Sequence, residues 1–237
     1  MTLNNVHIPV MLEEVKSFIP ISKKINVIDA TFGGGGYSKA LLEAYDINKL
    51  IAIDRDPITK IFARNLQKKY KNFNLINGKF SEIDNLILAF NKEKLECFDI
   101  IIFDLGLSSN QLEDADRGFS FNKDGPLNMN MGSSDISASE IINNLTEKEL
   151  ANIFFEYGNE KFSKRIARNI VKSRKIKLIE TTKELTKIIN ESIPNFIIKK
   201  SRINPATKTF QALRIYVNDE LKELDLALSK TTKLLKK

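Results

Sequence analysis

Short apolar runs alternate with amphipathic segments through the first half of the chain. The apolar runs are residues 25–28, 50–53, 73–76 and 98–103. They are rich in β-branched and aromatic residues and are too short for buried helices. The segments between them, 40–44, 57–69 and 83–90, carry helical patterns. Strands that alternate with helices at this spacing predict an α/β fold with a doubly wound parallel sheet.

The alternation stops after the fourth apolar run, and helical signals take over. Residues 111–132 are rich in Gly, Asp and Asn, which indicates an ordered functional loop rather than a linker. Three capping boxes follow, at Ser137/Glu140, Thr146/Glu149 and Thr181/Glu184. A single apolar stripe predicts one long helix from 207 to about 235. We therefore expect an α/β core of residues 1–111 and 209–237, interrupted by a helical domain at 112–208.

Positive charge is concentrated in the predicted insertion. The chain carries a net charge of +7. Residues 161–214 alone hold 15 Lys/Arg and three Asp/Glu, a net +12 that leaves −5 for the remainder. On a helical wheel of 161–175, one third of the circumference is basic, formed by Lys161, Lys164, Arg165, Arg168, Lys172 and Lys175. An ordinary solvated helix face is one explanation, but the uninterrupted charge favours contact with nucleic-acid phosphates.

The composition excludes several classes of protein. No apolar stretch approaches the length of a membrane span, and the N-terminus lacks the charged and apolar regions of a signal peptide. We therefore expect a cytoplasmic protein without a membrane anchor. Cys97 and His7 are the only residues of their types, so neither a disulfide framework nor a Cys/His metal site is expected. Cys97 is predicted to lie in the core beside the fourth strand.

The clearest candidate for chemistry is the turn after the first predicted strand. Asp29 precedes four consecutive glycines, Gly33 to Gly36, and Asp54 ends the second strand. Strand, glycine turn and helix let a ligand approach bare backbone, and an acidic residue ending the next strand is typical of a nucleotide's ribose site. A P-loop is disfavoured because Tyr37-Ser38-Lys39 follows the last glycine in place of Gly-Lys-Ser or Gly-Lys-Thr. A dinucleotide fingerprint fits weakly, because Ser38 replaces its third glycine. An acidic residue before the turn favours a cationic ligand such as S-adenosylmethionine over a pyrophosphate.

Seven motifs occur in order along the chain and resemble those of one family. They are DATFG (29–33), AIDRDP (52–57), DLGLSSNQL (104–112), DRGFSF (116–121), DGPL (124–127), YGNE (157–160) and PATKTFQA (205–212). Each is weak alone, but together they resemble the RsmH (MraW) family of bacterial small-subunit rRNA cytosine-N4 methyltransferases. The resemblance implies a class I methyltransferase core, S-adenosylmethionine as cofactor, and a cytidine in the decoding region of small-subunit (16S) rRNA as target.

The resemblance also implies a set of site residues. The family's cofactor-binding positions fall on Gly35, Gly36, Tyr37, Asp54, Phe80, Asp104 and Gln111. We expect Asp54 to face the ribose hydroxyls and Phe80 to lie against the adenine, with Asp29 facing the methionyl ammonium. Asp104 is the candidate catalytic residue: either its carboxylate or the carbonyl of Leu105 would accept a hydrogen bond from the cytosine amine. A role confined to binding the cofactor is the equal alternative for Asp104.

The chain departs from the family pattern at two places. Residues 127–131 read Leu-Asn-Met-Asn-Met where many members read Asp-Met-Arg-Met. Family members also continue beyond the final helix with another strand, so we expect a C-terminally truncated sheet whose 98–103 strand has an open outer edge. A truncated, non-catalytic RNA-binding fragment is therefore the alternative to an active enzyme. A nucleotide-dependent oxidoreductase is a second rival, which the missing third glycine and the basic insertion argue against.

Overall fold

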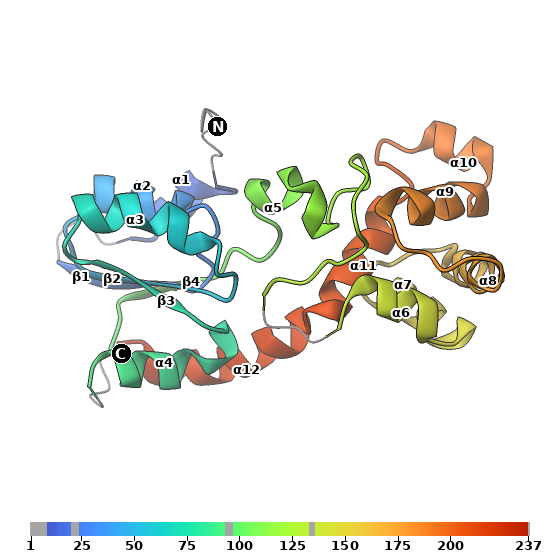
Figure 1. The fold of residues 1–237 in the computed structure, drawn as a ribbon. Coiled ribbons are helices and arrows are strands. Elements are labelled where there is room, and N and C mark those ends of the chain that lie inside the picture. The colour runs from blue at the N-terminus through green and yellow to red at the C-terminus, as the bar shows by residue number, and fades with distance from the viewer. Residues whose placement is uncertain (1–8, 20–23, 93–96, 133–135, 237) are drawn as a thin grey trace. The chain divides into compact units, whose positions relative to one another are not determined.

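The structure is a computed structural model that describes residues 9–19, 24–92, 97–132 and 136–236. The chain divides into two compact units (Figure 1). The core unit comprises Met1–Ser109 with Leu221–Lys237, and the helical unit comprises Asn110–Glu220. A helical segment thus interrupts an α/β unit, and the chain returns to that unit at its last helix.

A parallel sheet organises the core unit. Its strands are β1 (Ile25–Asp29), β2 (Ile47–Asp54), β3 (Phe73–Asn77) and β4 (Ile100–Ile102). Among the described residues they form a four-stranded sheet in the order β3-β2-β1-β4, and every pairing is parallel. All four predicted strands are confirmed, and the crossover order is that of a doubly wound α/β sheet.

Helices cover both faces of this sheet, as Figure 1 shows. One face carries α1 (Leu12–Ser17), α2 (Gly36–Ala44) and α3 (Thr59–Lys69), and the other carries α4 (Ile83–Phe90) and α12 (Glu220–Leu234). Side chains alternate between the two faces along a strand. Val27 and Leu50 therefore belong to the apolar cluster on the side of α1, α2 and α3, whereas Ile28 and Ile51 belong to the cluster on the side of α4 and α12. Burial on both faces explains why these strands read as continuous apolar runs.

The outer edge of β4 differs from expectation. Phe98 forms a parallel bridge with Leu235, in which the Phe98 N–H donates to the Leu234 carbonyl at 2.7 Å and the Lys236 N–H donates to the Phe98 carbonyl at 2.9 Å. The predicted edge is therefore paired at Phe98 rather than open. Cys97, expected in the core, is exposed because it precedes the strand proper. His7 lies outside the described residues.

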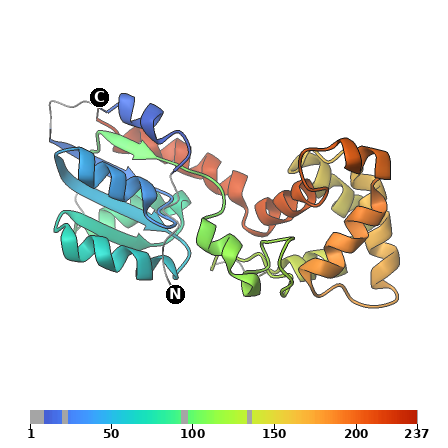
Figure 2. The ribbon, with the colours of Figure 1, turned by 90° about the horizontal axis from the view of Figure 1, so that it is seen from above.

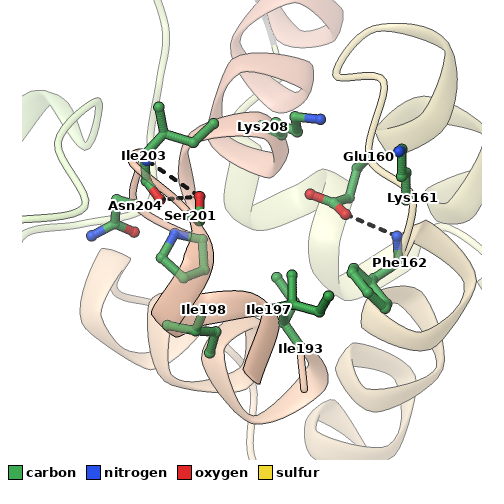
Figure 3. Close-up of a pocket in the computed structure, with 11 residues that line it drawn as sticks. Glu160, Lys161, Phe162, Ile193, Ile197, Ile198, Ser201, Ile203, Asn204 and Lys208 are labelled. Atoms are coloured by element: carbon green, nitrogen blue, oxygen red, sulfur yellow. Dashed lines mark hydrogen bonds between the residues drawn. The ribbon is translucent and has the colours of Figure 1, made fainter. Parts of the chain in front are cut away.

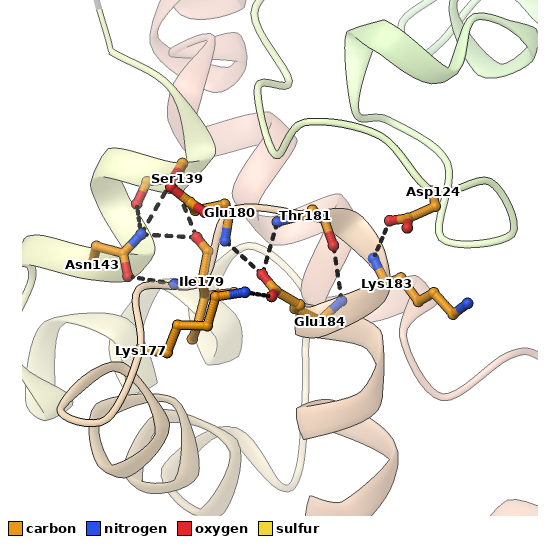
Figure 4. Close-up of polar contacts among 9 residues, drawn as sticks. All are labelled: Asp124, Ser139, Asn143, Lys177, Ile179, Glu180, Thr181, Lys183 and Glu184. Carbon is orange, nitrogen blue, oxygen red and sulfur yellow. Dashed lines mark hydrogen bonds and ion pairs between the residues drawn. The ribbon is translucent and has the colours of Figure 1, made fainter.

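The helical unit is built from short helices. They are α5 (Ser109–Glu113, which starts at the end of the core unit), α6 (Ala138–Asn144), α7 (Glu147–Glu156), α8 (Ser163–Arg174), α9 (Thr182–Ser192), α10 (Asn195–Lys200) and α11 (Thr207–Val217). All three predicted capping boxes are confirmed, at the starts of α6, α7 and α9. The last of them is drawn in Figure 4. The yellow-orange α8 and the orange α9 pack side by side (Figure 2).

One polar side chain ties α6 to the segment before α9. The Asn143 amide donates to the Ile179 carbonyl at 2.9 Å and its Oδ1 accepts the Ile179 N–H at 3.0 Å (Figure 4). The same amide donates to the carbonyl of Ser139. Asn143 therefore fixes the segment before α9 against α6 through backbone contacts that hydrophobic patterning does not reveal.

The single helix predicted for 207–235 is two helices. Asp219 adopts a left-handed backbone with φ 52°, which separates α11 from α12. A short ion pair spans the break, with Arg214 Nε 2.7 Å from Glu220 Oε1. The division between the units therefore falls at 220 rather than at 208, because α11 packs against α6 and α7 within the helical unit.

Candidate cofactor site

The turn between β1 and α2 needs glycine at two positions. Gly33 has φ 52° and Gly35 has φ 79°, in the left-handed region that L side chains rarely adopt. A Cβ on Gly35 would also stand 2.8 Å from the ring of Phe32. Glycine therefore keeps the turn close to the sheet and leaves backbone accessible at the start of α2, where N–H groups point outward.

Asp54 is fixed against this turn. It ends β2, and its Oδ2 accepts the Gly33 N–H at 2.7 Å while its Oδ1 accepts the Asp56 N–H at 2.8 Å. Its backbone carbonyl accepts the Gly78 N–H at 2.9 Å, which joins the end of β3 to the same place. Asp54, the predicted acid at the end of the second strand, and the glycine turn are thus joined by hydrogen bonds.

Asp29 lies deeper, at the end of β1. Its side chain is buried, and Oδ2 accepts the Ser38 hydroxyl at 2.6 Å while Oδ1 accepts the Thr31 N–H at 3.3 Å. Ser38, the residue that breaks the dinucleotide fingerprint, therefore has a specific partner of its own. This bond was not predicted from the sequence. The signal for it is a hydroxyl on the first turn of the helix that follows a strand-end acid.

Asp104 follows β4 and is tied to the same region through Thr31. The Asp104 N–H donates to Thr31 Oγ1 at 2.7 Å, and the Ala30 N–H donates to the Ile102 carbonyl at 2.9 Å. The carboxylate of Asp104 is on an exposed residue and is close enough to Asp29 to act on it electrostatically. Thr31 was not predicted as a site residue, because its role depends on a strand that lies far away in the sequence.

Burial makes two of these carboxyls hard to ionise. Burial raises the pKa of Asp29 to about 6, opposed by its hydrogen bond from Ser38, and the charge of Asp104 adds to the increase. Burial likewise raises the pKa of Asp54 to about 6, with a smaller contribution from Asp29. A positively charged ligand would favour the ionised forms, whereas a diphosphate would meet a cluster of acids.

Tyr37 and Phe80 shape the surroundings of the acids. The Tyr37 hydroxyl donates to the carbonyl of Val10, and burial, followed by the charges of Asp104 and Asp29, raises the pKa of this phenol. Phe80 meets Phe103 edge-on, with ring centroids 5.8 Å apart. Tyr37 therefore holds the segment before α1, and Phe80 places an aromatic ring after β3, where a flat group could pack.

Glu223 of α12 supports the turn that carries Phe80. Its Oε1 lies 3.1 Å from Lys79 Nζ, and its Oε2 accepts the hydroxyl of Ser81. Both neighbours of Phe80 are thus held by one buried carboxylate.

Not every predicted residue belongs to the core unit. Gln111 is buried in α5 and belongs to the helical unit. Its place in the cofactor site stays a prediction. The other predicted site residues belong to the core unit and lie at or near the carboxyl ends of its strands: Gly35, Gly36, Tyr37, Asp54, Phe80 and Asp104.

Within the described residues, no group of three or more His, Cys, Asp or Glu side chains could hold a metal ion. Nor is any described helix long and apolar enough to cross a membrane.

A parallel sheet of order β3-β2-β1-β4 with a glycine turn after β1 and an acid at the end of β2 is consistent with the class I methyltransferase fold. The chain belongs to the MraW methylase family, whose profile matches residues 4–237.

Relatives resemble the chain over almost its whole length. A protein of Rickettsia akari (strain Hartford) called ribosomal RNA small subunit methyltransferase H is 47% identical over 98% of this chain and 72% of its own length. Proteins of the same name from Ehrlichia canis (strain Jake) and from the Wolbachia of Culex pipiens (strain wPip) are 47% and 46% identical. These matches cover 93% and 97% of this chain, and 73% and 76% of the relatives.

Proposed function

We propose that this chain transfers a methyl group from S-adenosylmethionine to N4 of a cytidine in the decoding region of small-subunit (16S) rRNA. Its membership of the MraW methylase family supports a methyl transfer, and the names of its relatives support rRNA as the acceptor. The observation that carries the proposal is the contact of Asp54 with the glycine turn, with Asp29 and Asp104 beside it. Action on rRNA would place the protein in the cytoplasm.

The residues of the core unit suit a cationic nucleoside. S-adenosylmethionine supplies a methyl group already activated on a sulfonium. Asp29 would face its ammonium and Asp54 its ribose hydroxyls, while the open backbone of the glycine turn would allow close approach. Phe80 would pack against the adenine. The raised pKa values of Asp29 and Asp54 would fall when a cation binds, so part of the binding free energy would go into ionising them.

Asp104 is the group that we assign to the acceptor amine. The N4 nitrogen of cytosine is a weak nucleophile because its lone pair is delocalised into the ring. Asp104, or the Leu105 carbonyl beside it, would accept a hydrogen bond from this amine and help to localise the lone pair. Both residues are exposed at the end of β4, where the backbone of Asp104 is fixed by Thr31. Placement of the reacting atoms and exclusion of water would supply the remaining acceleration.

The helical unit would hold the RNA. The basic side chains of the predicted helix face are all exposed: Lys161, Lys164, Arg165, Arg168, Lys172 and Lys175. Arg168 lies 3.5 Å from Glu147, whereas Ile166 and Ile170 on the other side of α8 are buried. Such a face would contact phosphates without reading sequence, and would steady the backbone while the target base is unstacked.

A methyl-transfer assay tests the proposal. Small-subunit particles lacking the modification would be incubated with the chain and labelled S-adenosylmethionine, and the rRNA nucleosides analysed by mass spectrometry. We expect N4-methylcytidine at one decoding-region position. Methylation of another atom would contradict the proposed acceptor. Salt-sensitive RNA binding without heat of binding to S-adenosylmethionine would instead favour the non-catalytic RNA-binding alternative.

The role of Asp104 needs its own variant. Asp104→Asn is expected to slow methyl transfer at saturating S-adenosylmethionine. An unchanged rate under those conditions would exclude a catalytic role and leave Asp104 with cofactor binding alone.

A further inference from the structure

The helical unit contains a small apolar pocket of about 200 Å³ near the start of α11 (Figure 3). Its apolar lining comes from Phe162, Ile193, Ile197, Ile198, Ile203 and Pro205. These residues lie before α8, after α9, in α10 and before α11, so four segments converge on it. The volume is below the ~300–1,000 Å³ of pockets for drug-sized ligands, and it suits a single flat ring system.

Cations surround the mouth of the pocket. Lys161 and Lys208 line it, and Lys208 Nζ donates to the Asn159 carbonyl at 3.0 Å. Lys199, Lys200 and Arg202 come from the segment that forms one of its walls, and all three are exposed. An apolar slot with cations at its rim matches the two parts of a nucleotide, whose base is flat and whose phosphate is anionic.

A carboxylate inside the pocket specifies the base further. Glu160 is buried, and its Oε1 accepts the Phe162 N–H at 2.8 Å. Figure 3 shows the other carboxylate oxygen directed toward the space between Glu160 and Ser201. A carboxylate oxygen accepts hydrogen bonds, and the donors that a flat base offers at its edge are N–H groups. Cytosine and adenine carry an exocyclic amine, whereas uracil presents a carbonyl at the corresponding position.

We propose that this pocket receives one unstacked, amino-bearing base of the bound RNA strand, with Glu160 accepting its exocyclic amine and the surrounding lysines contacting the flanking phosphates. The inference rests on the proposed function only in taking RNA as the ligand. An acidic peptide would also meet the lysines, but its carboxylates would face Glu160 at close range. The observations therefore favour a base.

Homopolymers of equal charge test this preference. The full chain, without S-adenosylmethionine, would be titrated into fluorescently labelled nine-nucleotide oligocytidylate or oligouridylate. We expect oligocytidylate to bind about 10-fold more tightly, since one good base contact discriminates by roughly that factor.

Glu160→Gln then separates this pocket from any other cytosine site. The glutamine can still accept the Phe162 N–H but would present an amide donor to the base, so the preference should fall to within about 2-fold or reverse. Ser201→Trp, at an exposed position on the rim, should block entry and abolish the preference as well. Lys172→Ala on α8 is the matched control, which should weaken both oligonucleotides equally and leave the preference intact.

Three results would overturn the inference, and they differ from failure of the proposed function. Equal affinity of the unaltered chain for both oligonucleotides contradicts the base preference. A preference unchanged in both Glu160→Gln and Ser201→Trp contradicts this location. Binding of a nine-residue polyglutamate that is lost in Ser201→Trp, without loss of RNA binding, identifies a peptide site instead. Methyl transfer to rRNA could persist in all three cases, whereas its absence would contradict the proposed function and not the pocket.

Discussion

Gly33 donates its backbone N–H to Oδ2 of Asp54 at 2.7 Å, across 21 positions in the sequence. This bond joins the turn after β1 to the end of β2, and the Asp104 N–H joins the end of β4 to the same turn through Thr31. The position of each acid therefore depends on the conformation of the turn. Changes to the turn should alter cofactor binding even where they touch no acid.

Gly35→Ala should destabilise the turn. An alanine at φ 79° costs about 1–2 kcal/mol, and its Cβ would also press on the Phe32 ring. We expect a lower free energy of unfolding by about that amount and an S-adenosylmethionine affinity reduced about 10-fold. Gly34→Ala is the matched control, since Gly34 is exposed and does not have a positive φ. Equal losses in both variants, measured by denaturation and calorimetry, would contradict this role for Gly35.

The raised pKa values of Asp29 and Asp54 predict a pH dependence. Because both lie near 6 in the folded chain and at 3.8 ordinarily, the folded state binds more protons between these values. The free energy of unfolding should therefore fall as pH rises from about 4 to about 6, through these two groups. The affinity for S-adenosylmethionine should rise over the upper part of this range, because the cation binds the ionised carboxylates, and should level off above pH 7.

Asp29→Asn is the control for this pH dependence. It removes one titrating group while its amide oxygen can still accept the Ser38 hydroxyl. We expect a shallower dependence of affinity on pH than in the unaltered chain, measured by calorimetry between pH 5 and pH 8. An identical profile would show that Asp29 does not titrate on binding.

Thr31→Val should uncouple Asp104 from the turn. Valine has the same shape but cannot accept the Asp104 N–H, and the loss of this exposed hydrogen bond corresponds to about 0.5–1.5 kcal/mol. We expect S-adenosylmethionine to bind about 10-fold more weakly, with Thr31→Ser close to the unaltered chain because serine keeps the hydroxyl. If the serine variant is impaired as strongly as the valine variant, packing rather than the hydrogen bond is responsible.

The core sheet and the helix starts were predictable because their signals are local. Residues 25–28 and 50–53 are apolar without interruption because both faces of the sheet are covered. Ser137 and Glu140 cap the same helix that they signal. The glycine turn was likewise visible from its composition, together with the strand-end acid Asp54.

Contacts between distant segments could not be predicted in this way. The break between α11 and α12 follows from the left-handed Asp219 and from Asn218, whose side chain binds backbone 87 and 89 positions earlier. The hydrophobic stripe from 207 to 235 predicts neither the left-handed backbone of Asp219 nor the hydrogen bonds of Asn218. The roles of Thr31 and Ser38 were not predicted for the same reason. Each hydroxyl has a role only because the fold brings its hydrogen-bond partner next to it.

Asn218→Ala should destabilise the helical unit. The buried amide accepts the Met131 N–H at 2.9 Å and donates to the Met129 carbonyl at 2.8 Å. Alanine would leave both backbone groups without these partners, and we expect a loss of about 2–4 kcal/mol in the free energy of unfolding. Asn195→Ala, at an exposed position in α10, should change it by no more than about 0.5 kcal/mol. Similar effects of the two changes on denaturation would refute this assignment.

The basic face of α8 should act through phosphates. Replacing Lys164 and Lys172 with alanine is expected to lower rRNA affinity for every sequence alike and to reduce the slope of log affinity against log salt by about 2. Lys60→Ala, an exposed change in α3 of the core unit, is the control. An unchanged salt slope in the double variant would show that this face does not contact the RNA backbone.

Calorimetric titration of S-adenosylmethionine into the unaltered chain, Asp54→Asn and Glu43→Gln tests the cofactor site most directly. Asparagine at position 54 would turn an amide N–H toward the N–H of Gly33 or of Asp56, in place of an accepting oxygen. Glu43→Gln is the control, since Glu43 is an exposed residue of α2. We predict one binding site in the unaltered chain, an affinity at least about 10-fold weaker in Asp54→Asn, and no change in Glu43→Gln. The same affinity in all three proteins, or no heat of binding in the unaltered chain, would contradict the account.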